Sequence, residues 1–353
     1  MAFQGVNYMA PNHSPNETPP DPGTVLDLIE AFRRSKVMFA AVAFGIFDRL
    51  SESPEVATTL AAHLGADRDA LERLLDACVA FGFLSKLGGV YSNQPVAETY
   101  LRRSSPQTLT GYILYSNNAL YPMWGKLEDA VREGTHRWQQ TFGHDGNIFD
   151  HFFRTEESRR DFIAGMNGFG MISSPKVVAA FDLSRFTRLV DLGGATGHLA
   201  IAACERYAAL HGAVFDLAPV IELAKEFVTK SPVSDRVDLI AGDFFSDPLP
   251  EADLYSVGRI LHDWSDEKVR GLLAKIHQAL PAGGALLVAE RLLDEDKTGP
   301  LPTLLQSLNM LICTEGKERT LSEYATLLCD AGFAEVEGRR TDAPLDAILA
   351  VKR

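Results

Sequence analysis

Acidic residues follow three successive apolar segments in the second half of the chain, and a glycine-rich turn follows the first segment. Asp191 precedes the turn at 193–197, Asp216 ends the second segment, and Asp243 comes just after the third. Any one of these acids alone would more often be a solvated loop residue or a helix cap. Together they favour a ligand site, because ligands of parallel α/β sheets bind at the carboxyl ends of the strands.

The glycine-rich turn predicts a backbone that approaches its ligand closely, since small residues allow tight strand-to-helix turns. The spacing of glycines in 193–197 does not fit the dinucleotide fingerprint, so a nicotinamide dehydrogenase is the least favoured enzyme class. Asp216 can accept both hydroxyls of a ribose. Asp243 can accept from an adenine amino group while Phe244 covers the ring. This set resembles the S-adenosylmethionine-dependent methyltransferase fold, in which the loop approaches the amino-acid part of the cofactor.

His262 is the candidate general base, because it follows the fourth apolar segment, near where a donor methyl group would lie in such a fold. Methyl transfer is an in-line displacement, so the acceptor oxygen must be aligned and nucleophilic. A phenol has a pKa of about 10 and a histidine one of about 6.5, and a nearby imidazole can take the phenol proton as attack proceeds. Glu290 and Glu318 are placed to orient the imidazole and stabilise its cation, although Glu318 could equally begin a helix before Ser322.

Strands that alternate with helices must position these residues. Apolar runs predict five strands, at 189–192, 213–216, 237–240, 254–257 and 285–289. Their alternation with helical stretches is typical of a parallel α/β sheet with right-handed crossovers. Two further runs, 334–337 and 347–351, are separated by about ten residues without a helical pattern, which is too short for a crossover. The last strand is therefore expected to run antiparallel, as a hairpin.

The first third of the chain is mainly helical. Residues 1–22 carry five prolines and are expected to form a disordered tail. Helical periodicity and two short apolar runs around a Gly-Gly pair then follow, at 28–50, 56–64, 69–81 and 83–92. Three helices and a hairpin are typical of a winged helix. The helix in the recognition position carries three acids and one arginine at 69–76, so DNA contact is not expected.

The composition argues against several classes of protein. The chain has 353 residues and a net charge of −13, and an acidic balance disfavours binding to nucleic acid or to an anionic membrane. It contains neither an apolar run of about 18 residues nor a basic-then-apolar N-terminal signal. The four cysteines lie far apart, so neither a disulfide framework nor a zinc site is expected. A reducing cytoplasm is the simplest setting.

The residues around His262 take the resemblance further. Leu-His-Asp-Trp-Ser-Asp-Glu at 261–267 is followed by Pro-Ala-Gly-Gly at 281–284 and by Gly-Lys-Glu-Arg-Thr at 316–320. As a set, these motifs are similar to those of the dimeric, metal-independent small-molecule O-methyltransferases of the plant phenolic and bacterial polyketide type. Among these the chain looks most like acetylserotonin (hydroxyindole) O-methyltransferases, over most of its length.

The resemblance implies a Rossmann-like methyltransferase sheet with an antiparallel C-terminal hairpin, preceded by a winged-helix-like dimerisation domain. The chain would divide into the tail, the dimerisation domain, an aromatic-rich helical region that helps to form the substrate pocket, and the cofactor domain, at 1–22, 23–104, 105–184 and 185–353. The cofactor would be S-adenosyl-L-methionine, released as S-adenosyl-L-homocysteine. The partners would be an aromatic small molecule and a second copy of the chain, with no nucleic acid and no membrane.

The resemblance also implies three groups of site residues. His262 would be the general base, flanked by Glu290 and Glu318, without a metal. The cofactor residues would be Asp191, Gly193, Asp216, Leu217, Gly242, Asp243, Phe244, Arg259 and Phe153. The acceptor residues would be Asp263, Asn309, Met310, Cys313, Tyr115 and Trp124.

One residue departs from the loop pattern of the methyltransferase fold, and two depart from the pattern expected of the hydroxyindole enzymes. Ala195 replaces the usual third loop glycine, Cys313 stands at an expected glutamine, and Gly170 at an expected tryptophan. The last two changes would reshape the pocket, so N-acetylserotonin itself is not assigned as the acceptor.

The leading hypothesis is methyl transfer from S-adenosylmethionine to a hydroxyl of a phenol, a hydroxyindole or a polyketide-like molecule. The alternatives are a C- or N-methyltransferase on the same scaffold, and a family member that binds the cofactor without methyl transfer. A ligand-sensing winged-helix regulator is a further alternative of a different class.

Overall fold

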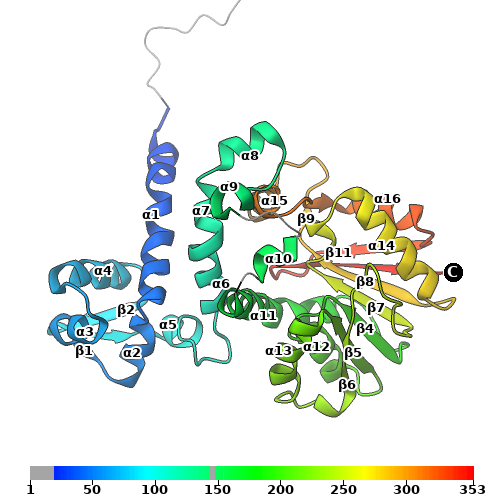
Figure 1. Cartoon of the computed structure of the whole chain (residues 1–353), viewed down its shortest axis with the longest axis horizontal. Helices are drawn as coiled ribbons and strands as arrows, with labels where there is room; N and C mark the ends of the chain where they lie inside the picture. Colours follow the sequence, from blue (N-terminus) through cyan, green and yellow to red (C-terminus); the bar gives the residue numbers. More distant parts are fainter. Residues whose placement is uncertain (1–19, 144–147, 154) are drawn as a thin grey trace, which may run out of the picture.

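The computed structural model describes residues 20–143, 148–153 and 155–353, so most of the tail expected at 1–22 lies outside the described residues. A small N-terminal lobe and a larger lobe around a seven-stranded sheet are connected by a group of helices (Figure 1). Among the described residues, no helix has the length and apolar character needed to cross a bilayer.

The N-terminal lobe has the helix and hairpin order that the sequence predicts. Its helices are α1 (Gly23–Ala43), α2 (Ile46–Glu52), α3 (Ala57–Leu64), α4 (Arg68–Ala80) and α5 (Pro95–Tyr100). Its sheet pairs β1 (Glu55–Val56), β3 (Val90–Asn93) and β2 (Leu84–Leu87) in antiparallel order. The periodicity at 28–50 is divided between two helices, because Gly45 adopts a left-handed φ of 71° that ends α1.

Short helices and one long helix connect the two lobes. They are α6 (Thr110–Tyr115), the π-helical turn η1 (Ser116–Leu120), α7 (Tyr121–Trp124), α8 (Leu127–Glu133), α9 (Trp138–Phe142), α10 (Ile148–Phe152) and α11 (Glu156–Ala179). Glycines let α11 approach its neighbours closely. A Cβ atom on Gly165 would lie 2.9 Å from the Tyr112 backbone of α6, and one on Gly170 would overlap the ring of His198 in α12 (His198–Arg206).

The large sheet has the order β11-β12-β8-β7-β4-β5-β6. Its strands are β4 (Arg188–Leu192), β5 (His211–Asp216), β6 (Val237–Ala241), β7 (Leu254–Gly258), β8 (Ala285–Glu290), β11 (Glu335–Arg339) and β12 (Asp346–Val351). The first five run parallel, and β12 pairs antiparallel with both β8 and β11. The predicted α/β sheet with a terminal antiparallel hairpin is confirmed.

Helices cover both faces of this sheet (Figure 1). Besides α12 they include α13 (Ala218–Val228), α14 (Asp266–Ala279), α15 (Leu301–Cys313) and α16 (Leu321–Asp330), with short turns η2 (Ser234–Arg236) and η3 (Leu261–Asp263). Every residue of β8 is buried, in agreement with its continuous apolar run.

A two-stranded parallel pair lies beside the large sheet and brings two distant segments together. Strand β9 (Leu292–Leu293) pairs with β10 (Arg319–Thr320), so the residue before β10 comes close to the end of β8. Thr320 caps α16 in a reciprocal capping box with Glu323, and Glu318 therefore precedes the helix instead of beginning it.

Candidate active site

A cavity of about 540 Å³ lies where β4, β5, β6 and β7 end. Its lining includes all but one of the residues expected to contact the cofactor: Phe153, Gly193, Asp216, Leu217, Gly242, Asp243, Phe244 and Arg259. The cavity is within the volume range of ordinary small-molecule sites. Its place at the strand ends agrees with the position predicted from the three acids.

The glycine-rich turn after β4 is held against Asp216. The backbone N–H of Ala195 donates to Asp216 Oδ2 at 2.9 Å, and that of Leu217 donates to Oδ1 at 2.7 Å. Gly193 has a φ of 67°, and a Cβ atom there would lie 2.5 Å from Ile260 Cδ1. Ala195 keeps a φ of 49° despite its methyl group, a strained backbone of the kind found at ligand sites. Burial raises the pKa of Asp216 to about 6.

Asp191, the exception, lies beneath the turn, outside the lining of the cavity. Its Oδ1 accepts from Ser256 Oγ at 2.7 Å, and a Cβ atom on Gly194 would lie 2.7 Å from Oδ2. Burial raises the pKa of this carboxyl to about 7. Asp191 therefore supports the turn from below, and its direct contact with the cofactor stays a prediction.

The loop after β6 carries Asp243 and Phe244 into the cavity. Asp243 Oδ1 accepts from the backbone N–H of Phe245 at 2.8 Å, which fixes the start of the loop. Lys275 Nζ donates to the backbone oxygens of Phe244, Phe245 and Asp247, at 2.8, 3.0 and 2.6 Å. A cation from α14 thus holds the loop from outside, a contact with no signature in the sequence.

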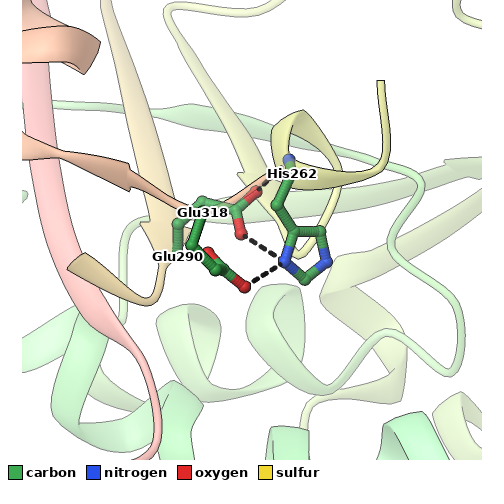
Figure 2. Close-up of side chains that lie close together, drawn as sticks. All are labelled: His262, Glu290 and Glu318. Carbon is green, nitrogen blue, oxygen red and sulfur yellow. Dashed lines mark hydrogen bonds and ion pairs between the residues drawn. The ribbon is translucent and has the colours of Figure 1, made fainter. Parts of the chain in front are cut away.

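His262 lies in η3 with two glutamates against one edge of its ring (Figure 2). Nδ1 is 2.7 Å from Glu318 Oε1 and 3.4 Å from Glu290 Oε2. All three side chains are buried. Burial raises the pKa of Glu318 and of Glu290, while the positive charge of Arg259 counteracts this rise at both carboxyls. A carboxylate at Nδ1 selects the tautomer that leaves Nε2 free to accept a proton.

Glu290 also supports the backbone that carries His262. Its Oε1 accepts from the N–H groups of Ile260 at 3.0 Å, Leu261 at 2.8 Å and His262 at 3.4 Å. The same carboxylate that faces the ring therefore fixes the turn.

His262, Glu290 and Glu318 offer ligand atoms within 4.8 Å of one another, a set that could also hold a metal ion. The 2.7 Å contact at Nδ1 has the length of a direct hydrogen bond.

A second cavity, of about 40 Å³, adjoins His262. Its lining includes the expected acceptor residues Tyr115, Asp263, Asn309, Met310 and Cys313. Trp124 does not line it, but its Nε1 donates to Asn309 Oδ1 at 3.0 Å. Four residues line both cavities: Phe162, Met166, Arg259 and Asp263. The larger cavity and the smaller one are therefore neighbours, with Asp263 Oδ1 3.6 Å from His262 Nε2.

Several lining residues were not predicted. Phe162 and Met166 come from α11 and line both cavities, and His198 comes from the first position of α12. The aromatic richness of the helical region was the one signal for Phe162. Met166 and His198 belong to no motif, and only the packing of α11 against the sheet places them.

Comparisons with known proteins agree with this arrangement. A family model described as an O-methyltransferase domain matches residues 124–334, and one described as an O-methyltransferase dimerisation domain matches residues 26–103. Acetylserotonin O-methyltransferase of Gallus gallus is 43% identical over 338 residues, which cover 94% of this chain and 97% of that protein. The protein of the same name from Bos taurus is 42% identical, with 91% and 95% covered.

Solved structures show the same similarity. The crystal structure of human N-acetylserotonin methyltransferase in complex with SAM (S-adenosylmethionine) superposes with a TM-score of 0.89 and 39% identity, covering 98% of this chain and 99% of that one. PigF with SAH (S-adenosylhomocysteine) has a TM-score of 0.85 and 30% identity, with 94% and 100% covered.

Proposed function

Because the chain belongs to the O-methyltransferase family and is an S-adenosylmethionine-dependent enzyme of the hydroxyindole or aromatic type, we propose that His262 is the general base of methyl transfer to an aromatic hydroxyl. The observation that carries the proposal is the 2.7 Å contact between His262 Nδ1 and Glu318 Oε1. It orients the ring and leaves Nε2 beside the small cavity.

The chemistry follows from this orientation. S-adenosylmethionine supplies an electrophilic methyl group on a sulfonium. His262 Nε2 takes the proton of the acceptor hydroxyl as its oxygen attacks that methyl carbon and the carbon–sulfur bond breaks. Glu318 stabilises the imidazolium that forms, and Glu290 holds the turn that carries the ring. The products are a methyl ether and S-adenosylhomocysteine.

We place the nucleoside of the cofactor over β5 and β6. Asp216 would accept from the ribose hydroxyls, and Asp243 and Phe244 would contact the adenine. The residues fit this ligand, since the buried Asp216 carboxylate is already oriented by two backbone N–H groups. The remaining contacts of the cavity would come from Phe153, Gly193, Leu217, Gly242 and Arg259.

We place the aromatic acceptor against Asn309, Met310 and Tyr115, next to His262. The acetylserotonin enzymes among the relatives support a hydroxyindole or a related phenol as the acceptor class. Cys313 stands at the position of an expected glutamine, so no side-chain amide faces the acceptor there. Its side chain is buried, and its Sγ is 2.9 Å from the Asn309 carbonyl oxygen. The space beside Gly170 is filled by His198.

The proposal includes metal-independent catalysis. The direct hydrogen bond at Nδ1 and the three backbone donors on Glu290 Oε1 support it, because both would be disturbed if these atoms bound an ion. Dialysis against EDTA is expected to leave methyl transfer unchanged. A loss of activity that Zn²⁺ or Mg²⁺ restores would overturn this part.

The dimerisation domain indicates a homodimer. A row of apolar side chains on α1 is more than half exposed and supports this helix as part of the interface: Val25, Leu26, Leu28, Ile29 and Phe32. The net charge of −13 supports the absence of a nucleic-acid partner.

The four free cysteines, of which three are buried, support a reducing cytoplasm as the location.

The direct test is methyl transfer from labelled S-adenosylmethionine to a panel of hydroxyindoles and phenols, with the product identified by mass spectrometry. An O-methylated product is expected, and His262→Ala should reduce its rate by about 10²–10⁴-fold while SAH binding is retained. An N- or C-methylated product would favour the alternative methyltransferases. An undiminished rate in His262→Ala would show that the assigned base is wrong.

A further inference from the structure

His198 occupies a slot that a glycine leaves open. It is the first residue of α12 and lines the larger cavity. A Cβ atom on Gly170 of α11 would lie 2.2 Å from Cγ and Cδ2 of the His198 ring. No heavy atoms approach so closely without a bond, so this ring position requires glycine at 170. The two helices are therefore complementary at this point, and the imidazole is confined between them.

Hydrogen bonds fix the orientation of the confined ring. His198 Nδ1 is 2.9 Å from Ser174 Oγ, one helical turn beyond Gly170. Two residues before His198, Thr196 Oγ1 donates to Asn167 Oδ1 at 2.8 Å, which ties the same loop to the same helix. Within the described part of the chain, His198 Nε2 has no hydrogen-bond partner.

The surroundings of His198 favour a neutral ring and an anionic ligand. Burial, together with the positive charge of Arg259, lowers the pKa of His198 to about 4. We infer that Ser174 Oγ donates to Nδ1; Nε2 then carries the proton and can donate. Arg259 also lines the cavity, and its Nε lacks a hydrogen-bond partner among the described residues. The first backbone N–H groups of α12 add positive potential at the same place.

The sheet order separates this end of the cavity from the nucleoside end. Asp216 and Asp243 follow β5 and β6, on one side of β4, whereas Arg259 follows β7, on the other side. His198 comes from the helix after β4 and lies close enough to Arg259 for the guanidinium charge to act on it. A cofactor with its nucleoside over β5 and β6 would extend its amino-acid part toward this pair.

We propose that His198 binds the carboxylate of the amino-acid part of S-adenosylmethionine, with Nε2–H as donor and Arg259 as the neighbouring cation. The proposal rests on the function proposed above. It assigns to His198 a contact that neither the glycine-rich turn nor the acids at the strand ends supply.

The test compares two ligands by isothermal titration calorimetry on the full chain. S-adenosylhomocysteine carries the amino-acid carboxylate, whereas 5′-methylthioadenosine has the same nucleoside without it. His198→Ala is expected to weaken S-adenosylhomocysteine about 10-fold or more and to change 5′-methylthioadenosine less than about 2-fold. An equal loss for both ligands, or no loss for either, would overturn the proposal. A wild-type protein that binds neither would overturn the proposed function as well.

Two further variants separate ligand contact from packing. Gly170→Ala displaces the ring and should weaken S-adenosylhomocysteine selectively, as His198→Ala does. The double variant, Gly170→Ala with His198→Ala, should bind S-adenosylhomocysteine no worse than His198→Ala alone. Once the ring is absent, the added methyl group at position 170 has no ring to displace. Additive losses would contradict a shared cause. His211→Ala, at an exposed histidine that begins β5, serves as the matched control and should bind both ligands normally.

Discussion

The larger cavity and the small cavity beside His262 are neighbours of opposite character. The larger one measures about 540 Å³ and is lined by the loops that follow β4, β5, β6 and β7 and by side chains of α10 and α11. The smaller one measures about 40 Å³ and is enclosed by side chains from four helices, from η3 and from the loop after β7. A space of about 40 Å³ is smaller than an aromatic acceptor, which would also need space from the adjoining cavity or from movement of the side chains that line both. The larger cavity is thus open as it stands, whereas the smaller one alone does not have the volume of an aromatic molecule.

The carboxylates of the two regions also differ in what they hold. Asp216 accepts from two backbone N–H groups that belong to the cavity wall, so its loss should weaken ligand binding. Glu318 contacts the imidazole itself, so its loss should slow the reaction. The comparison predicts that binding and rate separate cleanly between the two regions.

The largest effect is expected at the His262 cluster. Glu318→Gln should lower kcat by about 10²–10⁴-fold, because a neutral amide no longer stabilises the imidazolium. The dissociation constant of S-adenosylhomocysteine should stay within about 2-fold of wild type. Steady-state kinetics and calorimetry measure the two quantities. A weakened affinity with an intact kcat would break the proposed separation.

The opposite pattern is expected in the larger cavity. Asp216→Asn should weaken S-adenosylhomocysteine by roughly 10–100-fold, since one or two hydrogen bonds to a charged acceptor are lost. At saturating cofactor its kcat should remain within a few-fold of wild type. A collapse of kcat in Asp216→Asn would place this acid in the chemical step.

A separate variant, Lys275→Met, removes a cation outside the cavity and tests whether the loop after β6 needs this external support.

A smaller effect is expected behind the acceptor pocket. Trp124→Phe removes the donor to Asn309 Oδ1, and we expect the KM of the acceptor to rise about 5-fold, the equivalent of about 1 kcal/mol. Cofactor affinity should not change. Combined with Asn309→Ala, the two losses should not add, because they remove the same contact. Additive losses would mean that Trp124 acts elsewhere.

The smallest effect concerns Asp191 and the pH dependence of stability. Its pKa is about 7 in the folded chain and near 4 when unfolded, so between these values only the folded state keeps the proton. Stability from this group is therefore complete below about pH 4 and is lost as the pH rises toward 7. Asp191→Asn cannot ionise, so its Tm relative to wild type should rise from pH 5 to pH 7.5, by the equivalent of about 1–3 kcal/mol. Parallel Tm curves would show that Asp191 titrates normally.

The two regions differ in how far the sequence alone predicted them. The strand ends, the glycine-rich turn, Asp216, Asp243 and the terminal hairpin follow from patterns within short stretches of chain. Short stretches of chain did not show whether Glu318 begins a helix or contacts the histidine. Glu318 reaches His262 because β9 pairs with β10, a contact between distant segments. For the same reason the sequence did not reveal that Ser256 holds Asp191 beneath the turn.

The sequence by itself determined which segments become strands and helices and which residue types stand at the strand ends. These features depend on hydrophobic periodicity and on backbone preferences, which act between residues close together in the chain. The tertiary structure decided the contact between Trp124 and Asn309, which are 185 positions apart in the chain. It also decided the packing of the His198 ring into the space beside Gly170. Such contacts depend on close packing between whole helices, and no local pattern records which side chain will fill a gap left by a distant glycine.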